Sequence, residues 1–203
     1  MKYYLSSYKI GNEPKRLKKM LPKMARIGYV PNAFDYAEPK VRKERNKVGI
    51  EEISGLGIDV EMLDLKRYFG KEAALKKKID SLNGIWVRGG NTFVLRQAMR
   101  LSGLDNILKK ICRKDFLYGG YSAGACVLSP SLRYLQIADD PTITPYKSKE
   151  VIWTGLGLID YAFLPHYKSD NPESVAIDKE VEYCKKNNIP FKTVRDGEVI
   201  IIE

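Results

Sequence analysis

One pentapeptide of this 203-residue chain has the residue types of a serine nucleophile. Gly120-Tyr121-Ser122-Ala123-Gly124 follows the apolar run Phe116-Leu117-Tyr118 and opens the small, apolar segment Ala123 to Leu128. A strand-to-helix turn at this point would hold the Ser122 hydroxyl outward, and the small neighbours would let a substrate approach the backbone. The same pattern occurs in ordinary glycine-rich turns, so the pentapeptide alone leaves catalysis and a structural turn as equal alternatives.

The chain contains a single histidine, and its position suits a catalytic base. His166 follows a short apolar run, Ala162 to Leu164, that can form a strand. A serine hydroxyl is a weak nucleophile and needs a base within hydrogen-bonding reach, most often a histidine. His166 in isolation reads as a partly exposed loop residue. Because it lies downstream of an elbow serine, we predict that His166 is the general base.

A glycine-rich turn offers the groups that would stabilise an oxyanion. Arg88-Gly89-Gly90-Asn91-Thr92-Phe93 follows the apolar run Gly84 to Val87. An oxyanion hole needs two donors, and we expect them to be the N–H of Ala123 and a backbone N–H of Gly89-Gly90. The alternatives are a simple tight turn or a phosphate cradle. The dinucleotide pattern Gly-x-Gly-x-x-Gly and the P-loop Lys-Ser/Thr ending are absent, which disfavours nucleotide binding.

The elements that must position these residues alternate between strand and helix patterns along the chain. This order predicts an α/β fold with a mainly parallel sheet and helices on both faces. At 203 residues, one domain spanning 1–203 is the expected organisation. The expected strands are Tyr3 to Ser6, Arg26 to Val30, Asp59 to Leu63, Gly84 to Val87, Phe116 to Tyr118, Ala162 to Leu164, Phe191 to Val194 and Glu198 to Ile202. The expected helices are Glu13 to Met20, Pro39 to Leu56, Glu72 to Leu82, Thr92 to Leu101, Asn106 to Lys114, Ala123 to Leu128 and Glu173 to Lys186.

Such a fold fixes where the chemistry should lie. Ligands of open α/β sheets bind beyond the carboxyl ends of the strands, so the turn at Gly89-Gly90 and the turn at Ser122 should share one edge. The segment from about 130 to 160 is less regular and is expected to drape over the site. Whether it closes as a lid stays open.

Composition excludes several classes of protein. A hydrophobic content of 44% with 30% charged residues is ordinary for a globular chain. The apolar runs are too short to span a bilayer, and the first residues lack the pattern of a signal peptide, so a cytoplasmic location is expected. Cys112, Cys126 and Cys184 show no metal-ligand spacing and are expected to be reduced and buried. With one histidine, we expect no metal site.

The net charge of +10 raises the question of an anionic partner. Basic residues gather in two expected helices, at 15–23 and 40–47. No RNA-binding or helix-turn-helix signature accompanies them, and helical charge runs are usually solvated faces. Nucleic acid is therefore not the expected partner.

Taken together, these motifs resemble the dipeptidase E (aspartyl dipeptidase) family, which is related to the cyanophycinases. The resemblance rests on Gly89-Gly90-Asn91-Thr92-Phe93, then Gly120-Tyr121-Ser122-Ala123-Gly124-Ala125, then Pro165-His166-Tyr167. It implies a fold like that of class I glutamine amidotransferases, with serine in place of the usual cysteine nucleophile. It also implies a serine peptidase that removes an N-terminal aspartate from small peptides without a metal or an organic cofactor.

The resemblance assigns roles residue by residue. It implies Ser122 as nucleophile, His166 as base, and Gly90 and Ala123 as oxyanion donors, with Gly89 and Asn91 beside them. For the third member of the triad it points to Asp196 in Asp196-Gly197, where the family usually has glutamate. Asp140 is the competing candidate, and an ordinary Asp-Gly turn is the structural alternative for Asp196.

Two departures bear on the substrate. Arg88 stands where the family often has a third glycine, and it could offer a bidentate contact to a substrate carboxylate or be a surface arginine at the loop mouth. The stretch Glu173 to Glu182 contains no arginine to read an aspartyl side chain. We therefore expect a serine-type peptidase acting on small peptides, with Asp-X dipeptides as one candidate substrate. The alternatives are an esterase or amidase with the same groups, and a non-catalytic ligand-binding domain. The oligomeric state is left open.

Overall fold

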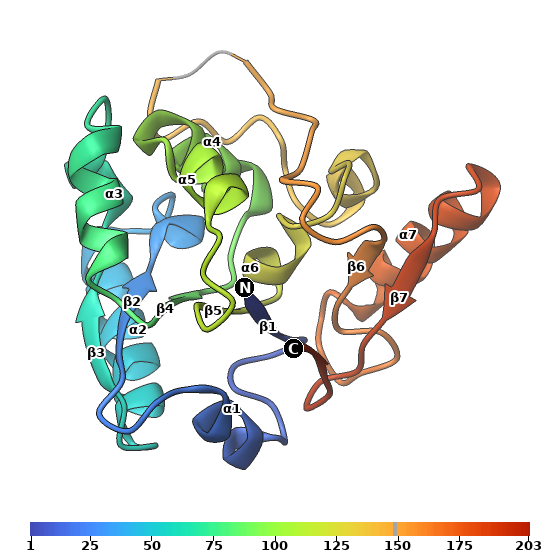
Figure 1. Cartoon of the computed structure of the whole chain (residues 1–203). Helices are drawn as coiled ribbons and strands as arrows, with labels where there is room; N and C mark the ends of the chain where they lie inside the picture. The colour runs from blue at the N-terminus through green and yellow to red at the C-terminus, as the bar shows by residue number, and fades with distance from the viewer. Residues whose placement is uncertain (148–149) are drawn as a thin grey trace.

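A six-stranded sheet forms the centre of the molecule (Figure 1). The computed structural model describes residues 1–147 and 150–203. The strand order is β3-β2-β4-β5-β1-β8, and every neighbouring pair is parallel except β1 and β8. The predicted, mainly parallel sheet is therefore confirmed. Its strands are β1 (Lys2–Ser6), β2 (Arg26–Val30), β3 (Asp59–Met62), β4 (Gly84–Val87), β5 (Leu117–Tyr121) and β8 (Val199–Ile202).

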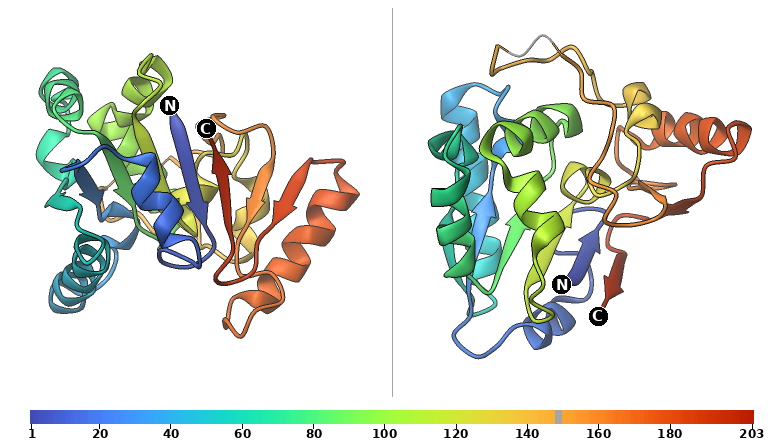
Figure 2. Two further views of the ribbon diagram at one scale, coloured as in Figure 1. Left: turned by 60° about the horizontal axis from the view of Figure 1, so that its bottom comes forward. Right: turned by 45° about the horizontal axis from the view of Figure 1, so that its top comes forward.

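Helices cover both faces of this sheet, because successive strand residues point to opposite sides. Tyr4 and Trp86 pack with α1 and α2, whereas Leu5 and Val87 belong to the core shared with α3 to α7. The predicted helices on both faces are thus confirmed (Figure 2). The helices are α1 (Pro14–Met20), α2 (Pro39–Ser54), α3 (Glu72–Asp80), α4 (Thr92–Ser102), α5 (Leu104–Lys110), α6 (Ala123–Cys126) and α7 (Ser174–Lys186), with short 3-10 turns η1 (Asn32–Phe34), η2 (Leu65–Tyr68) and η3 (Arg133–Ile137).

The C-terminal third departs from a single continuous sheet. Strands β6 (Ala162–Leu164) and β7 (Phe191–Thr193) pair with each other in parallel and form a separate two-stranded sheet. The chain then returns as β8, which runs antiparallel to β1, so the two termini lie close together (Figure 2). Helix α7 and the small sheet lie on the side of the molecule opposite β3 (Figure 1). One helix also begins earlier than expected: Gly103, with φ 78°, ends α4, and α5 starts directly at Leu104.

Strand register brings the two glycine-containing turns to one edge, as predicted. Val87 at the end of β4 pairs with Gly120 of β5, and Ser6 at the end of β1 pairs with Tyr121. The residues that follow these three parallel strands therefore emerge side by side. They are Ser7 after β1, the turn at Arg88-Gly89-Gly90 after β4, and Ser122 after β5.

The irregular segment after α6 is tied to this edge. The side chain of Asp139 accepts a hydrogen bond of 2.8 Å from the Thr92 N–H at the start of α4. Further along, the Tyr146 hydroxyl donates to Asp35 at 2.6 Å. The lid considered for 130–160 includes residues 148–149, which lie outside the described residues. Across the described ranges, no helix is long and apolar enough to cross a membrane.

Candidate active site

Ser122 lies in a strained turn between β5 and α6. Its backbone has φ 49° and ψ −120°, a conformation that residues other than glycine rarely adopt, and it caps the N-terminus of α6. Close packing below the turn explains the neighbouring glycine: a Cβ on Gly124 would lie 2.2 Å from the Val87 carbonyl oxygen on β4. The pentapeptide is thus a strand-to-helix turn that holds a serine in an unusual backbone conformation.

His166 pairs with Asp196 at the same end of the sheet. His166 follows β6 and has φ 58°, and Asp196 lies in the turn that joins β7 to β8. Their Nδ1 and Oδ1 atoms are 2.6 Å apart, and the His166 side chain is 3% exposed. With a carboxylate as acceptor, the Nδ1–H donates and the Nε2 lone pair is left available. This is the arrangement of a base oriented by an acid.

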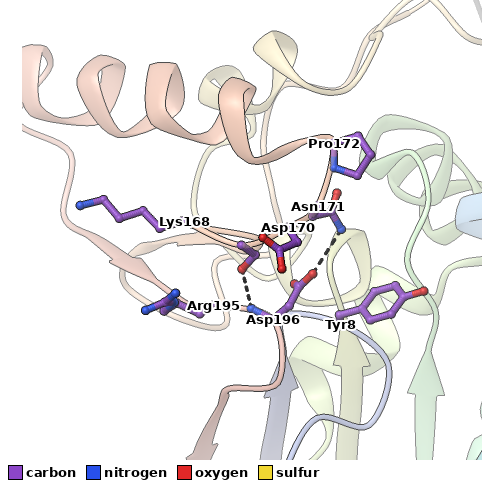
Figure 3. Close-up of a pocket in the computed structure, with 8 residues that line it drawn as sticks. Tyr8, Lys168, Asp170, Asn171, Pro172, Arg195 and Asp196 are labelled. Carbon is purple, nitrogen blue, oxygen red and sulfur yellow. Dashed lines mark hydrogen bonds between the residues drawn. The ribbon is translucent and has the colours of Figure 1, made fainter.

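Three further polar side chains hold this pair in place. The Ser7 hydroxyl donates to Asp196 Oδ1 at 2.7 Å and accepts the His166 N–H at 2.8 Å. The Ser169 hydroxyl accepts the Asp196 N–H at 2.8 Å. Asn171 Nδ2 lies 3.4 Å from Asp196 Oδ2 and 3.0 Å from His166 Nδ1, and Figure 3 shows its side chain directed at Asp196. The carboxylate is therefore held from several sides.

A cleft of about 310 Å³ connects the serine to the histidine. Ser122 and His166 both line it, and no hydrogen bond joins their side chains within the described part of the chain. His166 Nε2 instead lies 3.7 Å from a carboxylate oxygen of Glu173. Contacts between a nucleophile and its base are often long in a ligand-free enzyme and tighten when substrate binds.

The turn after β4 supplies backbone N–H groups next to Ser122. Gly90 has φ 143°, and a Cβ there would lie 2.3 Å from the Ala33 carbonyl oxygen, so only glycine fits. The turn is also close to the nucleophile, because a Cβ on Gly89 would lie 3.1 Å from Ser122 Cβ. Among the described residues, neither the Gly90 N–H nor the Ala123 N–H donates to a protein acceptor. Both are available for a substrate oxygen.

Two other predicted binding residues have different surroundings. Arg88 is 7% exposed and lines the cleft; its guanidinium donates to Asn46 at 2.7 Å and lies 4.1 Å from the centre of the Phe34 ring. Arg88 is therefore a buried cation that these contacts fix in place, and not an exposed surface arginine. Asn91 is absent from the residues that line the cleft, because its side chain caps α4 at Val94 and donates to the Asp140 carbonyl. The role of Asn91 in substrate binding stays a prediction.

Asp140, the competing third member, lies away from the histidine. It is exposed, and its carboxylate accepts hydrogen bonds from the N–H and the hydroxyl of Thr142. It is Asp196 that lies beside His166.

Sequence reasoning missed Ser7, Asn171 and Glu173. The signal for Ser7 was its position after β1, the neighbour of β5, because a residue there must reach the same sheet edge. Asn171 and Glu173 lie between β6 and α7, in a loop whose path no local pattern predicts.

The cysteines differ from the expectation at one position. Cys126 and Cys184 are buried, but Cys112 is exposed, because it follows the end of α5 on the surface. Burial raises the pKa of the Cys126 thiol well above its ordinary value, so Cys126 is inert beside the serine.

Comparison with known proteins agrees with this geometry. The chain is 30% identical to an uncharacterized peptidase of Listeria monocytogenes over 163 residues, covering 80% of this chain and 76% of the relative. It is 28% identical over 188 residues to peptidase E of Streptomyces coelicolor, covering 90% of this chain and 70% of the relative. A crystal structure of a candidate peptidase E from Listeria monocytogenes EGD-e shares the fold, with a TM-score of 0.75 and 24% identity over 100% of this chain and 98% of the other. The model of peptidase family S51 matches residues 7–203, and the chain therefore belongs to this family of serine hydrolases.

Proposed function

We propose that this peptidase hydrolyses small peptides through an acyl-enzyme on Ser122. The observation that carries the proposal is the pair of His166 and Asp196, joined at 2.6 Å, in a cleft that the strained Ser122 also lines. A serine, a histidine and a carboxylate that act together as a triad perform acyl transfer on unrelated folds.

The steps follow from the geometry. The Ser122 hydroxyl oxygen attacks the peptide carbonyl carbon while His166 Nε2 takes its proton. The resulting oxyanion accepts hydrogen bonds from the N–H groups of Gly90 and Ala123. The C–N bond then breaks, and His166 returns the proton to the leaving amine. Water, deprotonated by His166, hydrolyses the acyl-enzyme by the reverse sequence, and Asp196 stabilises the imidazolium in both halves.

The charge of the cleft suits a small peptide with a carboxylate. Three cations, Lys9, Arg45 and Arg88, line it together with two carboxylates, Glu52 and Glu173. Arg88 keeps one terminal guanidinium nitrogen, Nη2, without an acceptor among the described residues. A rigidly held guanidinium can bind a carboxylate of the substrate.

Replacement of the nucleophile tests the proposal. We expect Ser122→Ala to lower kcat by about 10⁴- to 10⁶-fold without unfolding the protein, since the nucleophile of a triad acts as part of a unit. A fluorophosphonate probe should label the wild type and leave Ser122→Ala unlabelled. Ser131→Ala, outside the cleft, is the matched control and should behave as wild type. Wild-type turnover of a peptide by Ser122→Ala would refute the mechanism. Parallel libraries of dipeptides and esters decide between a peptidase and an esterase with the same groups.

A further inference from the structure

A second, smaller cavity lies beside Ser122 and is acidic. Its volume is about 10 Å³, room for one water-sized group. Ser122 and Glu173 line both this cavity and the open cleft, so both spaces border the nucleophile. Thr92, Asp139 and Glu180 complete its polar lining, and apolar residues such as Ala123 and Leu135 form the rest. We call it the acidic pocket.

One carboxyl group of the acidic pocket is fully buried and unpartnered. Glu180, on the inner side of α7, is 0% exposed, and neither of its carboxylate oxygens has a hydrogen-bond partner among the described residues. Thr92 is 1% exposed, and its hydroxyl lies beside the Asp139 carboxylate. Asp139 accepts one hydrogen bond, from the Thr92 N–H. A buried polar group without a partner costs about 1–3 kcal/mol, and a charged one costs more, so these groups need a function or a ligand.

The carboxyl groups of the acidic pocket have raised pKa values and, within the described part of the chain, no cationic neighbour in the pocket. Burial, together with the charges of Asp139 and Glu173, raises the pKa of Glu180 to about 9. The nearby Ala138 N–H lowers the pKa of Glu180 by a smaller amount, and that N–H also donates a hydrogen bond to the Leu135 carbonyl. Burial likewise raises the pKa of Asp139 to about 6. No lysine or arginine among the described residues lines the pocket, so no cationic side chain there balances an ionised Glu180 or Asp139.

We propose that the acidic pocket binds a primary ammonium group of the substrate, held by Glu180, Asp139 and the Thr92 hydroxyl. This inference rests on the proposed function. Attack by Ser122 on the substrate carbonyl is what fixes the position of the substrate relative to the pocket. An ammonium has three donors and no acceptor, which matches these three acceptors. Its entry supplies the missing counter-ion and lets Glu180 ionise.

Other groups fit this pocket less well. A carboxylate would meet the ionised Asp139 above about pH 6, the pKa to which burial raises that group. A guanidinium is larger than one water-sized cavity of about 10 Å³. An aspartyl side chain is therefore not the group that this pocket selects. With Arg88 and Arg45 across the cleft, the charges favour a short peptide whose ammonium and carboxylate are both free.

The ammonium could come from the α-amino group or from a lysine-type side chain, and a small substrate panel separates the two. The panel is Ala-Ala, N-acetyl-Ala-Ala, Lys-Ala, N-acetyl-Lys-Ala, Nε-acetyl-Lys-Ala and Asp-Ala. If the α-amino group enters the pocket, acetylation of that group should lower kcat/KM by about 10- to 100-fold, the worth of a hydrogen bond to a charged group. If the lysine side chain enters, N-acetyl-Lys-Ala should keep its rate and Nε-acetyl-Lys-Ala should lose it.

Glu180→Gln tests the pocket itself. It keeps the side-chain shape and removes the charge, so kcat/KM for the preferred free-amine substrate should fall by about 10- to 100-fold, mainly through KM. Its activity on the matching acetylated substrate should not change. Asp178→Asn, an exposed acid on the same helix, is the matched control and should behave as wild type. Labelling by the fluorophosphonate probe reports on Ser122 independently of the pocket, and should proceed at the wild-type rate in Glu180→Gln.

The outcomes separate the two proposals. Labelling and turnover with equal rates on free and acetylated amines would overturn the acidic pocket as an ammonium site and leave Ser122 as nucleophile. An unchanged KM of the Glu180→Gln variant for every free-amine substrate would also overturn the ammonium site. Absence of both labelling and turnover in the wild type would overturn the proposed function itself.

Discussion

Asp196 and Ser7, 189 residues apart in the sequence, share a hydrogen bond of 2.7 Å directly beside His166. The same Ser7 hydroxyl accepts the His166 backbone N–H, so one small side chain fixes both the acid and the backbone of the base. The relationship exists because β1 lies between β5 and β8, which places the end of β1 next to both Ser122 and the turn that carries Asp196.

Asp196→Asn should abolish most of the activity while leaving the fold intact. The amide of the variant can donate its N–H to His166 Nδ1, which favours the wrong tautomer of the imidazole, and a neutral amide does not stabilise the imidazolium. We expect kcat to fall by about 10⁴-fold, measured by steady-state turnover of the best dipeptide.

Asp140→Asn is the control for this variant. Within the described part of the chain, the Asp140 carboxylate accepts hydrogen bonds only from Thr142, and the side chain is exposed. Activity should therefore stay within twofold of wild type, roughly the limit for a surface change of about 0.5 kcal/mol. If Asp140→Asn were the more damaging change, the assignment of Asp196 would be wrong.

Ser7→Ala should slow catalysis through the position of His166. Loss of a hydrogen bond to a charged acceptor is worth about 1.5–3 kcal/mol, which corresponds to about a 10- to 100-fold fall in kcat. KM should change little, since Ser7 is not among the residues that line the cleft.

The rate of fluorophosphonate labelling distinguishes positioning from general destabilisation at Ser7. It should fall by the same factor as kcat while Tm stays within a few degrees of wild type. A large drop in Tm with unchanged labelling would make Ser7 only a structural residue. Ser81→Ala, whose hydroxyl bonds the Lys78 carbonyl on the surface, is a control for loss of a serine hydroxyl.

Much of the central fold could be predicted because its signals are local. The strand at 84–87 is a continuous apolar run, and Asn91 before an apolar helix is a capping residue that the structure uses as such. Parallel strands then bring Gly90 and Ser122 to one edge without further information.

The rest of the site depends on long-range packing that no local pattern encodes. Glu180 occurs in an ordinary amphipathic helix, and only the packing of α7 against η3 and β6 buries its carboxylate beside Ser122. Asn91 was expected beside the substrate together with Gly89 and Gly90, and no local pattern predicted that its side chain would also donate to the Asp140 carbonyl. The direction in which the Glu180 and Asn91 side chains point depends on this packing, and it determines which groups they contact.

Gly90→Ala should damage both stability and activity. A methyl group there would lie 2.3 Å from the Ala33 carbonyl oxygen, and the backbone at φ 143° is strained for any side chain. The turn must shift, which moves a proposed oxyanion donor, and loss of one such donor costs about 10²- to 10³-fold in kcat.

Gly70→Ala is the matched control for Gly90→Ala. Gly70 also has positive φ, 69°, but no atom lies within 4 Å of the added methyl group. It should show only the backbone cost, about 1 kcal/mol, with normal kcat. Thermal unfolding and turnover of the two variants separate the steric clash from the backbone strain, and equal effects in both would remove Gly90 from the proposed oxyanion hole.

Glu180→Gln should change how stability depends on pH. The folded protein raises the pKa of Glu180 from its ordinary 4.5 to about 9, so the folded state binds a proton that the unfolded chain has released. By linkage, this protonation stabilises the fold fully below pH 4.5, and the contribution is lost as pH rises from 4.5 to about 9. The wild type should therefore lose stability relative to Glu180→Gln across that interval, with each 1 kcal/mol appearing as about 2–4 °C in Tm.

Thermal unfolding of both proteins from pH 4 to pH 9, with Asp178→Asn alongside, measures the difference between the curves. Parallel curves for wild type and Glu180→Gln would mean that Glu180 is already ionised and paired in the ligand-free protein, and the acidic pocket would then have no vacant charge to offer an ammonium.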